Sequence, residues 1–236
     1  MVRLYLVAMN RFLPLCLASV CFLMAGTACD AQSGSSASQS TKAAAGQATH
    51  RVGGNCDTCE LMYVDSPENI NTTDTNAAWK ESSGQKLRIS GTVYKPDGKT
   101  RAPNILLYYW HTNSEGVYAN REGLDPKVRP HGYIRGWVKT DGQGQYSIYT
   151  IRPGHYPGRS GPAHIHLLVK EPELPNEYYI DDILFEEDLR LTEAYRDKLE
   201  NRGGSGIVQT VQENGVQAAN RDIILGRNVP DYPEKD

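Results

Sequence analysis

The sequence has 236 residues, of which 22% are charged and 39% are hydrophobic. This balance is ordinary for a globular domain and excludes wholesale disorder. The formal net charge is −3, so the chain lacks the excess of basic residues typical of nucleic-acid-binding proteins, and no nucleic-acid partner is expected. Tyr (14) and Gly (22) are abundant whereas Phe (3) is scarce, which favours strands separated by turns.

The first part of the chain has the features of an export signal. A basic start precedes an apolar run from Phe12 to Met24, and small residues lead from there to Cys29. This pattern predicts a secretory signal peptide over residues 1–28, because the run is shorter than the roughly 20 apolar residues of a membrane span. The small residues before the cysteine resemble the lipobox of bacterial lipoproteins, except for Gly26, where lipoboxes usually carry Leu.

We therefore expect an exported protein. In one interpretation a lipid at Cys29 anchors it to a membrane face. In the other, ordinary cleavage releases it into the periplasm or the medium. Residues 29–51 are rich in Ser, Ala, Gln and Gly, which predicts a flexible tether, and the folded domain is expected over 52–236.

Two cysteines, Cys56 and Cys59, belong to the predicted domain. A four-cysteine zinc site is excluded, because no second pair follows them. In an exported protein such a pair favours a short-loop disulfide. A redox-active pair and metal binding by the two thiols remain alternatives.

Alternation of apolar and polar residues, interrupted by turn signals such as Asp97-Gly98, predicts a domain made mostly of strands. Strands are expected over residues 87–94, 104–110, 133–139, 145–151, 163–170 and 178–185, with weaker candidates at 207–211 and 222–225. One helix is expected over 188–201, capped by Asp188 and ended by Gly203-Gly204. The fold class predicted from this pattern is an all-β antiparallel sandwich with one short helix and long loops.

A possible metal site lies in the strand predicted over 163–170. His164 and His166 stand at positions i and i+2, so both imidazoles project from the same face of the strand. Two imidazoles in this arrangement can reach one ion. They suit Zn, Cu, Fe and Ni alike, so the pair alone does not select a metal.

Three segments together resemble the intradiol ring-cleavage dioxygenases, the family of catechol and protocatechuate 3,4-dioxygenases. The first runs from Trp110 to Tyr118, the second is TIRPGHYP at 150–157, and the third is PAHIH at 162–166. The resemblance covers residues 86–170, and further features resemble an exported bacterial branch of the family.

The resemblance implies a metal site with the ligands Tyr118, Tyr156, His164 and His166. Two phenolates are hard anionic donors, so the implied cofactor is a non-haem Fe(III) ion. In the resembled family the second tyrosine, here Tyr156, leaves the metal and accepts a substrate proton. The implied partners are a small aromatic diol and O₂, and the implied product is a muconate-type diacid.

One position departs from the family pattern. The family usually carries an arginine three residues before the first histidine ligand, and Gly161 stands there. Arg159 is the candidate to supply that charge from another backbone position. Two alternatives to the enzyme therefore stay open: an exported module that binds catecholates or ferric chelates without cleaving them, and a structural β-sandwich with a vestigial site. The motifs specify a class of substrate rather than one aromatic diol, and they specify no oligomeric state.

Several other side chains are expected to lie outside the catalytic centre. His111 is expected at its periphery, His131 in a turn, and His155 with its side chain directed away. Arg152 lies in the second segment, and the sequence is equally compatible with a side chain that lines the site and with one that points to solvent.

Overall fold

The computed structural model of the protein describes residues 51–81 and 84–234. The predicted signal peptide over 1–28, the anchoring Cys29 and most of the predicted tether lie outside these residues. Within the described part of the chain, no helix is both long and apolar enough to span a bilayer. Val52 is already buried in the core, close to the predicted start of the domain, although the domain boundaries themselves stay predictions.

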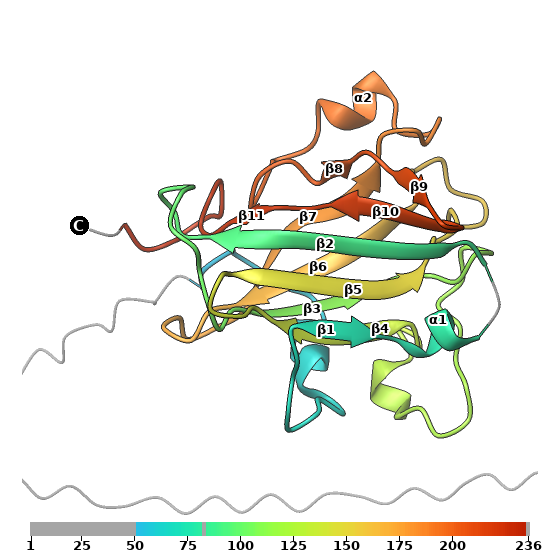
Figure 1. Ribbon diagram of the computed structural model, residues 1–236, viewed down its shortest axis with the longest axis horizontal. Helices are drawn as coiled ribbons and strands as arrows, with labels where there is room; N and C mark the ends of the chain where they lie inside the picture. Colours follow the sequence, from blue (N-terminus) through green and yellow to red (C-terminus); the bar gives the residue numbers. More distant parts are fainter. Residues whose placement is uncertain (1–50, 82–83, 235–236) are drawn as a thin grey trace, which may run out of the picture. The chain divides into compact units, whose positions relative to one another are not determined.

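Two β-sheets packed face to face form the domain, and Figure 1 shows β2, β5 and β10 of one sheet lying across β3, β6 and β7 of the other. The six-stranded sheet contains, in spatial order, β1 (Thr73–Thr75), β5 (Gln145–Ile151), β2 (Lys86–Tyr94), β10 (Val216–Asn220) and β9 (Val211–Glu213), with β11 (Ile223–Ile224) also paired to β2. The five-stranded sheet contains β4 (Arg135–Lys139), β3 (Leu106–Trp110), β6 (His164–Lys170), β7 (Tyr178–Phe185) and β8 (Ile207–Val208). The predicted all-β sandwich is confirmed.

The prediction that the sandwich is antiparallel holds for the central strand pairs and for the edge pairs β3–β4 and β9–β10, but not for every pair. β2 with β5, and β6 with β3 and β7, are antiparallel. By contrast β1 pairs with β5, β8 with β7, and β10 and β11 with β2, all in parallel, so both sheets are mixed. The parallel strands return to the sheets through long connections rather than tight hairpins, which is what parallel pairing requires.

The helix predicted over 188–201 is wrong in extent. Only α2 (Glu193–Arg196) is α-helical there, with the side chain of Thr192 capping its N-terminus. Leu189, inside the predicted helix, is 96% exposed, and no residue of α2 is buried, so α2 lacks the buried face that would stabilise a longer helix. A second α-helix, α1 (Ala77–Lys80), was not predicted.

Two short 3₁₀ helices complete the described elements: η1 (Cys59–Tyr63) and η2 (Pro126–Val128). η1 follows directly on the disulfide between Cys56 and Cys59, whose Cα atoms lie 5.6 Å apart. The disulfide prediction is therefore confirmed.

The strand alternation of β6 places one set of side chains in the core and the other on the outer face of its sheet. Ile165, Leu167 and Val169 belong to the main core between the sheets. His164 and His166 project from the opposite face. A second apolar cluster lies on that outer face and contains Cys59, Met62, Tyr108, Trp110 and Leu168. The outer face of the five-stranded sheet is thus partly covered by loops, and the histidine pair sits there.

Candidate metal centre

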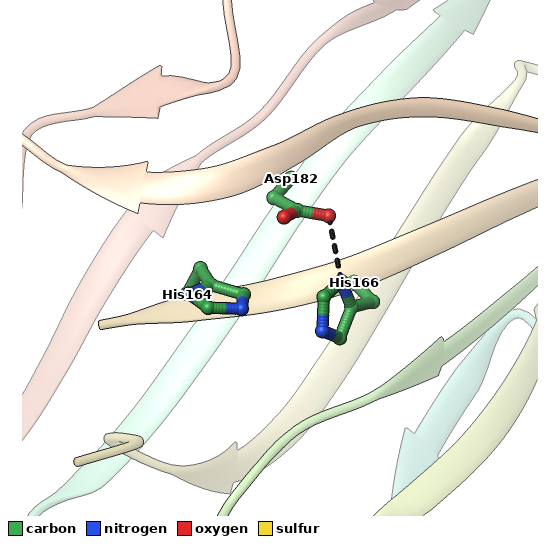
Figure 2. Close-up of side chains that lie close together, drawn as sticks. All are labelled: His164, His166 and Asp182. Carbon is green, nitrogen blue, oxygen red and sulfur yellow. Dashed lines mark hydrogen bonds and ion pairs between the residues drawn. The ribbon is translucent and has the colours of Figure 1, made fainter. Parts of the chain in front are cut away.

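The two histidines of β6 are held in the orientation that a metal ligand needs. Nδ1 of His164 lies 2.9 Å from the carbonyl oxygen of Pro162, and Nδ1 of His166 lies 2.9 Å from a carboxylate oxygen of Asp182, as Figure 2 shows for the second pair. An oxygen acceptor at Nδ1 fixes the proton on that nitrogen. The Nε2 lone pair of each ring is then left free for a metal.

A β-bulge brings Asp182 to His166. β6 and β7 change register between the pairs Ile165–Ile183 and Leu167–Ile180, so two residues of β7 oppose His166 alone. Such a bulge redirects a side chain that regular alternation would place elsewhere. Here it places the Asp182 carboxylate on the same face as the histidines.

Two glycines allow the loops that carry the tyrosines to come together. A Cβ at Gly116, which has a φ of +80°, would lie 1.6 Å from the carbonyl oxygen of His155. A Cβ at Gly154 would lie 2.3 Å from the carbonyl oxygen of Ser114. The amide of Gly154 also donates to the carbonyl of Asn113 at 2.8 Å. Only residues without a side chain fit at both positions, and this close contact aligns the two loops.

The four predicted ligand atoms converge in space. The Tyr118 hydroxyl lies 2.8 Å from Nε2 of His166, and the Tyr156 hydroxyl lies 3.2 Å from Nε2 of both His164 and His166. The two hydroxyls are hydrogen-bonded to each other. Donors bound at about 2.0–2.2 Å from one ion lie roughly 3 Å apart, so this donor set fits a metal ion with little movement.

Asp182 provides a carboxylate beside the same two rings. The ligand-type atoms of His164, His166 and Asp182 lie within 4.8 Å of one another (Figure 2). Because the carboxylate engages Nδ1 of His166 rather than facing its Nε2, we assign it to orienting the ring and not to the ligand set.

Burial sets the protonation of the metal-free site. Burial raises the pKa of the Tyr118 phenol far above its ordinary value, and the hydrogen bond with Tyr156 raises it further. Burial also raises the pKa of Tyr156, against the lowering effect of the Tyr118 hydrogen bond and the Arg159 charge. Burial lowers the pKa of His164, so this ring is neutral at pH 7. The neutral imidazole of His164 is ready to bind a metal, whereas the phenols need a strong cation in order to ionise.

Asp182 is the anionic group of this site. Burial by itself would raise its pKa, but the charge and hydrogen bond of His166, together with His164, hold that pKa below its ordinary value. The carboxylate therefore remains ionised at neutral pH and favours a proton on Nδ1 of His166.

The arginines near the site differ in position. Arg159 is exposed, and its guanidinium lies 5.7 Å from the centroid of the Tyr156 ring. Arg152 instead forms an ion pair with Glu187 at 2.7 Å and stacks over Phe185. It neither contacts the four ligand candidates nor points freely to solvent.

The other three histidines of the described residues serve other contacts. His155 pairs with Asp188 at 2.8 Å and, as predicted, is directed away from the ligand set. His111 is buried and hydrogen-bonded to the hydroxyl of Thr150. His131, expected in a turn, is buried and stacks on Trp110 with ring centroids 4.1 Å apart. Trp110 in turn stacks on His166 at 4.7 Å.

Sequence reasoning missed Asp182 and the roles of His131 and Trp110 in this stack. The pair Asp181-Asp182 inside an otherwise apolar strand was the one available signal, because two adjacent acids interrupt the alternation expected of a regular strand.

A cavity of about 410 Å³ opens beside His166. Its lining combines the ligand candidate His166 with aromatic and charged side chains from β7 and from the segment around α2, including Tyr179, Asp182, Tyr195 and Lys198. Its size lies within the range of small-molecule sites.

Comparison with known proteins agrees with this picture. A family model described as dioxygenase matches residues 61–202, more than half of the chain. The catechol 1,2-dioxygenase of Acinetobacter baylyi is 33% identical over 126 residues, which are 46% of this chain and 39% of that protein. Catechol 1,2-dioxygenase 2 of Acinetobacter lwoffii is 32% identical over 158 residues, 58% of this chain and 52% of that protein. The matches thus span about half or less of these relatives' length.

Solved structures show the same fold. The dioxygenase domain of a dioxygenase and carbohydrate-binding protein fusion from Streptomyces sp. SirexAA-E superposes with a TM-score of 0.51 and 23% identity, covering 68% of this chain and 89% of that one. The catechol 1,2-dioxygenase of Acinetobacter radioresistens has a TM-score of 0.50 at 17% identity, covering 72% of this chain and 61% of that one. On the family match, the chain belongs to the intradiol ring-cleavage dioxygenase family.

Proposed function

We propose that this protein is a non-haem Fe(III) dioxygenase that cleaves catechol-like diols with O₂ to muconate-type diacids. The proposal depends above all on one observation: the Tyr156 hydroxyl lies within hydrogen-bond distance of the Tyr118 hydroxyl and of Nε2 of both His164 and His166, and the Tyr118 hydroxyl is also bonded to His166. Phenolates favour a trivalent ion, and imidazole suits iron. Bound Fe(III) would supply the positive charge that ionises both phenols and the hydroxyls of the diol.

Tyr156 is the residue that we assign to proton transfer. Its hydroxyl has His164, His166 and Tyr118 as neighbours, so it remains inside the site if it leaves the ligand set. A phenolate there accepts a proton from the incoming diol at its own oxygen. The guanidinium of Arg159, near the Tyr156 ring, stabilises negative charge at this position.

Tyr118 is the tyrosine that we expect to stay in place. Its ring packs against the cluster that contains Trp110 on the outer face of the sheet. This packing fixes the direction of its hydroxyl. The two tyrosines therefore have different freedom, as a permanent ligand and an exchangeable one require.

We propose the cavity beside His166 as the place of the substrate ring. It adjoins the ligand set through His166, and Tyr195 and Tyr179 supply aromatic walls. The Tyr195 ring also faces Gly161, where a Cβ would lie 3.8 Å from it. The glycine therefore leaves room at the position where the resembled family usually carries arginine.

The test begins with protein loaded with ferric iron. We expect one iron per chain, a visible phenolate-to-Fe(III) charge-transfer band, and O₂ uptake with catechol that yields a ring-opened diacid. Tyr156→Phe should change both the band and the rate, whereas Tyr149→Phe, on β5 of the other sheet, should change neither. A wild-type protein with stoichiometric iron but no such band would contradict the assignment of tyrosine ligands.

A binding module for catecholates is the second candidate, and Gly161 together with the exposed position of Arg159 favours it. Such a module would bind catechol and shift the visible band without consuming O₂. Oxygen uptake measured alongside the spectral titration separates the two functions.

We also propose that the protein is exported and anchored by a lipid at Cys29. The disulfide between Cys56 and Cys59 supports an oxidising compartment. Cells fed labelled palmitate should yield labelled wild-type protein and unlabelled Cys29→Ala. Equal labelling of both proteins would contradict the anchor.

A further inference from the structure

Trp110 is surrounded by rings that connect the metal centre to a distant part of the chain. Its indole stacks on His166 at 4.7 Å with an interplanar angle of 26°, and on His131 at 4.1 Å with an angle of 13°. The Tyr179 ring lies 5.9 Å away. Only 4% of Trp110 is exposed, so a shift of any of these rings is transmitted to its neighbours.

His131 is fixed on the other side of Trp110 by two hydroxyls. Nε2 lies 3.0 Å from the Thr58 hydroxyl, and Nδ1 lies 2.9 Å from the Tyr108 hydroxyl. The Thr58 hydroxyl already donates to the carbonyl of Asp57 at 2.5 Å, so it accepts from His131. The Tyr108 hydroxyl then donates to Nδ1, and both ring nitrogens are satisfied in one tautomer.

Thr58 belongs to the loop that the disulfide closes. Its φ of +65° is unusual for a β-branched residue, which indicates that its surroundings hold it there. The Tyr179 hydroxyl donates to the Asp57 carbonyl at 2.8 Å. Cys59 is itself buried in the cluster with Trp110 and Tyr108. The loop is thus attached to the aromatic stack at three points.

We propose that the disulfide-closed loop Cys56–Cys59 positions the metal ligand His166, and that Thr58 is its positioning residue, acting through His131 and Trp110. This inference rests on the proposed iron site. Asp182 fixes one edge of the His166 ring, while the stack supports its face. The loop lies remote in sequence from every ligand candidate, so its contribution is separable from that of the ligands.

The test compares three substitutions of Thr58. Thr58→Val keeps the shape and removes the hydroxyl, Thr58→Gly removes it while suiting the positive φ, and Thr58→Ser keeps it. The measurements are the iron dissociation constant from competition with a chelator, the position of the charge-transfer band, and the melting temperature of the metal-free protein. Thr100→Val, in the exposed turn after β2, is the matched control.

We expect Thr58→Val and Thr58→Gly to weaken iron binding about tenfold and to shift the band, as loss of a supporting contact around a metal site does. The iron dissociation constants of Thr58→Ser and Thr100→Val should stay within about twofold of the wild-type value. The double variant Cys56→Ser/Cys59→Ser should behave like Thr58→Val.

Equal affinity and an unchanged band in all three Thr58 variants would overturn the inference while leaving the proposed function intact. A wild-type protein without iron or without the band would remove the metal site itself, and this inference with it. Thr58→Gly keeps the test valid if Thr58→Val does not fold.

Discussion

The two faces of the five-stranded sheet differ in what packs against their side chains. The inner face packs apolar residues such as Ile165 against the other sheet and excludes water. The outer face is covered by loops, which leave His164 and His166 half-buried. The same strand therefore contributes one set of residues to the core and presents the proposed metal ligands with the other.

The histidines themselves illustrate this difference. His111 is 1% exposed, donates from Nδ1 to the Thr112 carbonyl at 2.7 Å and accepts at Nε2 from Thr150 at 2.8 Å. Both of its nitrogens are satisfied by the protein, so it cannot bind a metal. His166 has a protein partner for Nδ1, while its Nε2 faces phenols that exchange for an ion. What distinguishes the proposed ligand from the core histidine is the partner of the second nitrogen.

The largest expected effect comes from the outer face. His166→Ala removes one of the four proposed ligands. Because the loss of even a supporting residue around a metal lowers affinity or activity about 10–100-fold, we expect activity to fall by more than about a hundredfold. Iron content and O₂ uptake with catechol measure this loss. The unfolding midpoint of the metal-free protein should change little, and a large drop there would show that the outer face also carries stability.

The inner face gives the opposite result. Ile165 is fully buried, and Ile165→Ala should lower the free energy of unfolding by about 2–5 kcal/mol through the cavity it leaves. Denaturant titration measures this loss of stability. The control is Val211→Ala, at a position that is 54% exposed, which should change stability by less than about 0.5 kcal/mol. The iron band of folded Ile165→Ala should match wild type; a shifted band would mean that the two faces are coupled.

Acid should also act through the inner face. Burial lowers the pKa of His111 from 6.5 to about 4. Below pH 6.5 the His111 ring is therefore protonated in the unfolded chain while it stays neutral in the native protein. Stability of the metal-free protein is therefore fully present above pH 6.5 and falls as the pH drops toward 4, by about 3 kcal/mol from this residue. Denaturation midpoints across that window measure the loss, and His111→Gln should flatten the slope. An equal slope in wild type and His111→Gln would show that another group causes the pH dependence of stability.

The sequence predicted the elements that depend on local pattern. The strands at 145–151 and 178–185 have the predicted bounds, and the spacing of His164 and His166 placed both on one face. The motif resemblance selected Tyr118 and Tyr156 among many tyrosines, and the structure brings their hydroxyls together. Local periodicity and recognisable motifs were sufficient for these features.

Features that depend on pairing between distant segments were not predictable. The bulge that presents Asp182 arises from the register between β6 and β7, which no window of sequence contains. The parallel pairs of β10 with β2 and of β8 with β7 depend on where long connections return. Asp188, the expected cap of a helix over 188–201, also binds His155 and the Ala163 amide, which belong to a distant loop that the local pattern does not contain.

Asp182 provides the finest test of the outer face, with a smaller effect than the loss of a ligand. Asp182→Asn keeps an oxygen near Nδ1 of His166 but removes the negative charge, so His166 becomes a weaker donor to the metal. We expect iron affinity to fall by about tenfold, and by up to about a hundredfold in Asp182→Ala. Chelator competition and the charge-transfer band measure both.

Asp181→Asn is the matched control for this prediction. The neighbouring carboxylate of Asp181 accepts hydrogen bonds from the backbone amides of Asn201 and Arg202, and it has no bond to His166. Its substitution should loosen that loop and leave iron affinity unchanged. If Asp181→Asn and Asp182→Asn bind iron equally well, the bulge serves only to hold the loop at Asn201 and Arg202 in place. If only Asp182→Asn binds it more weakly, the extra residue in β7 exists to bring a charge to the ligand ring.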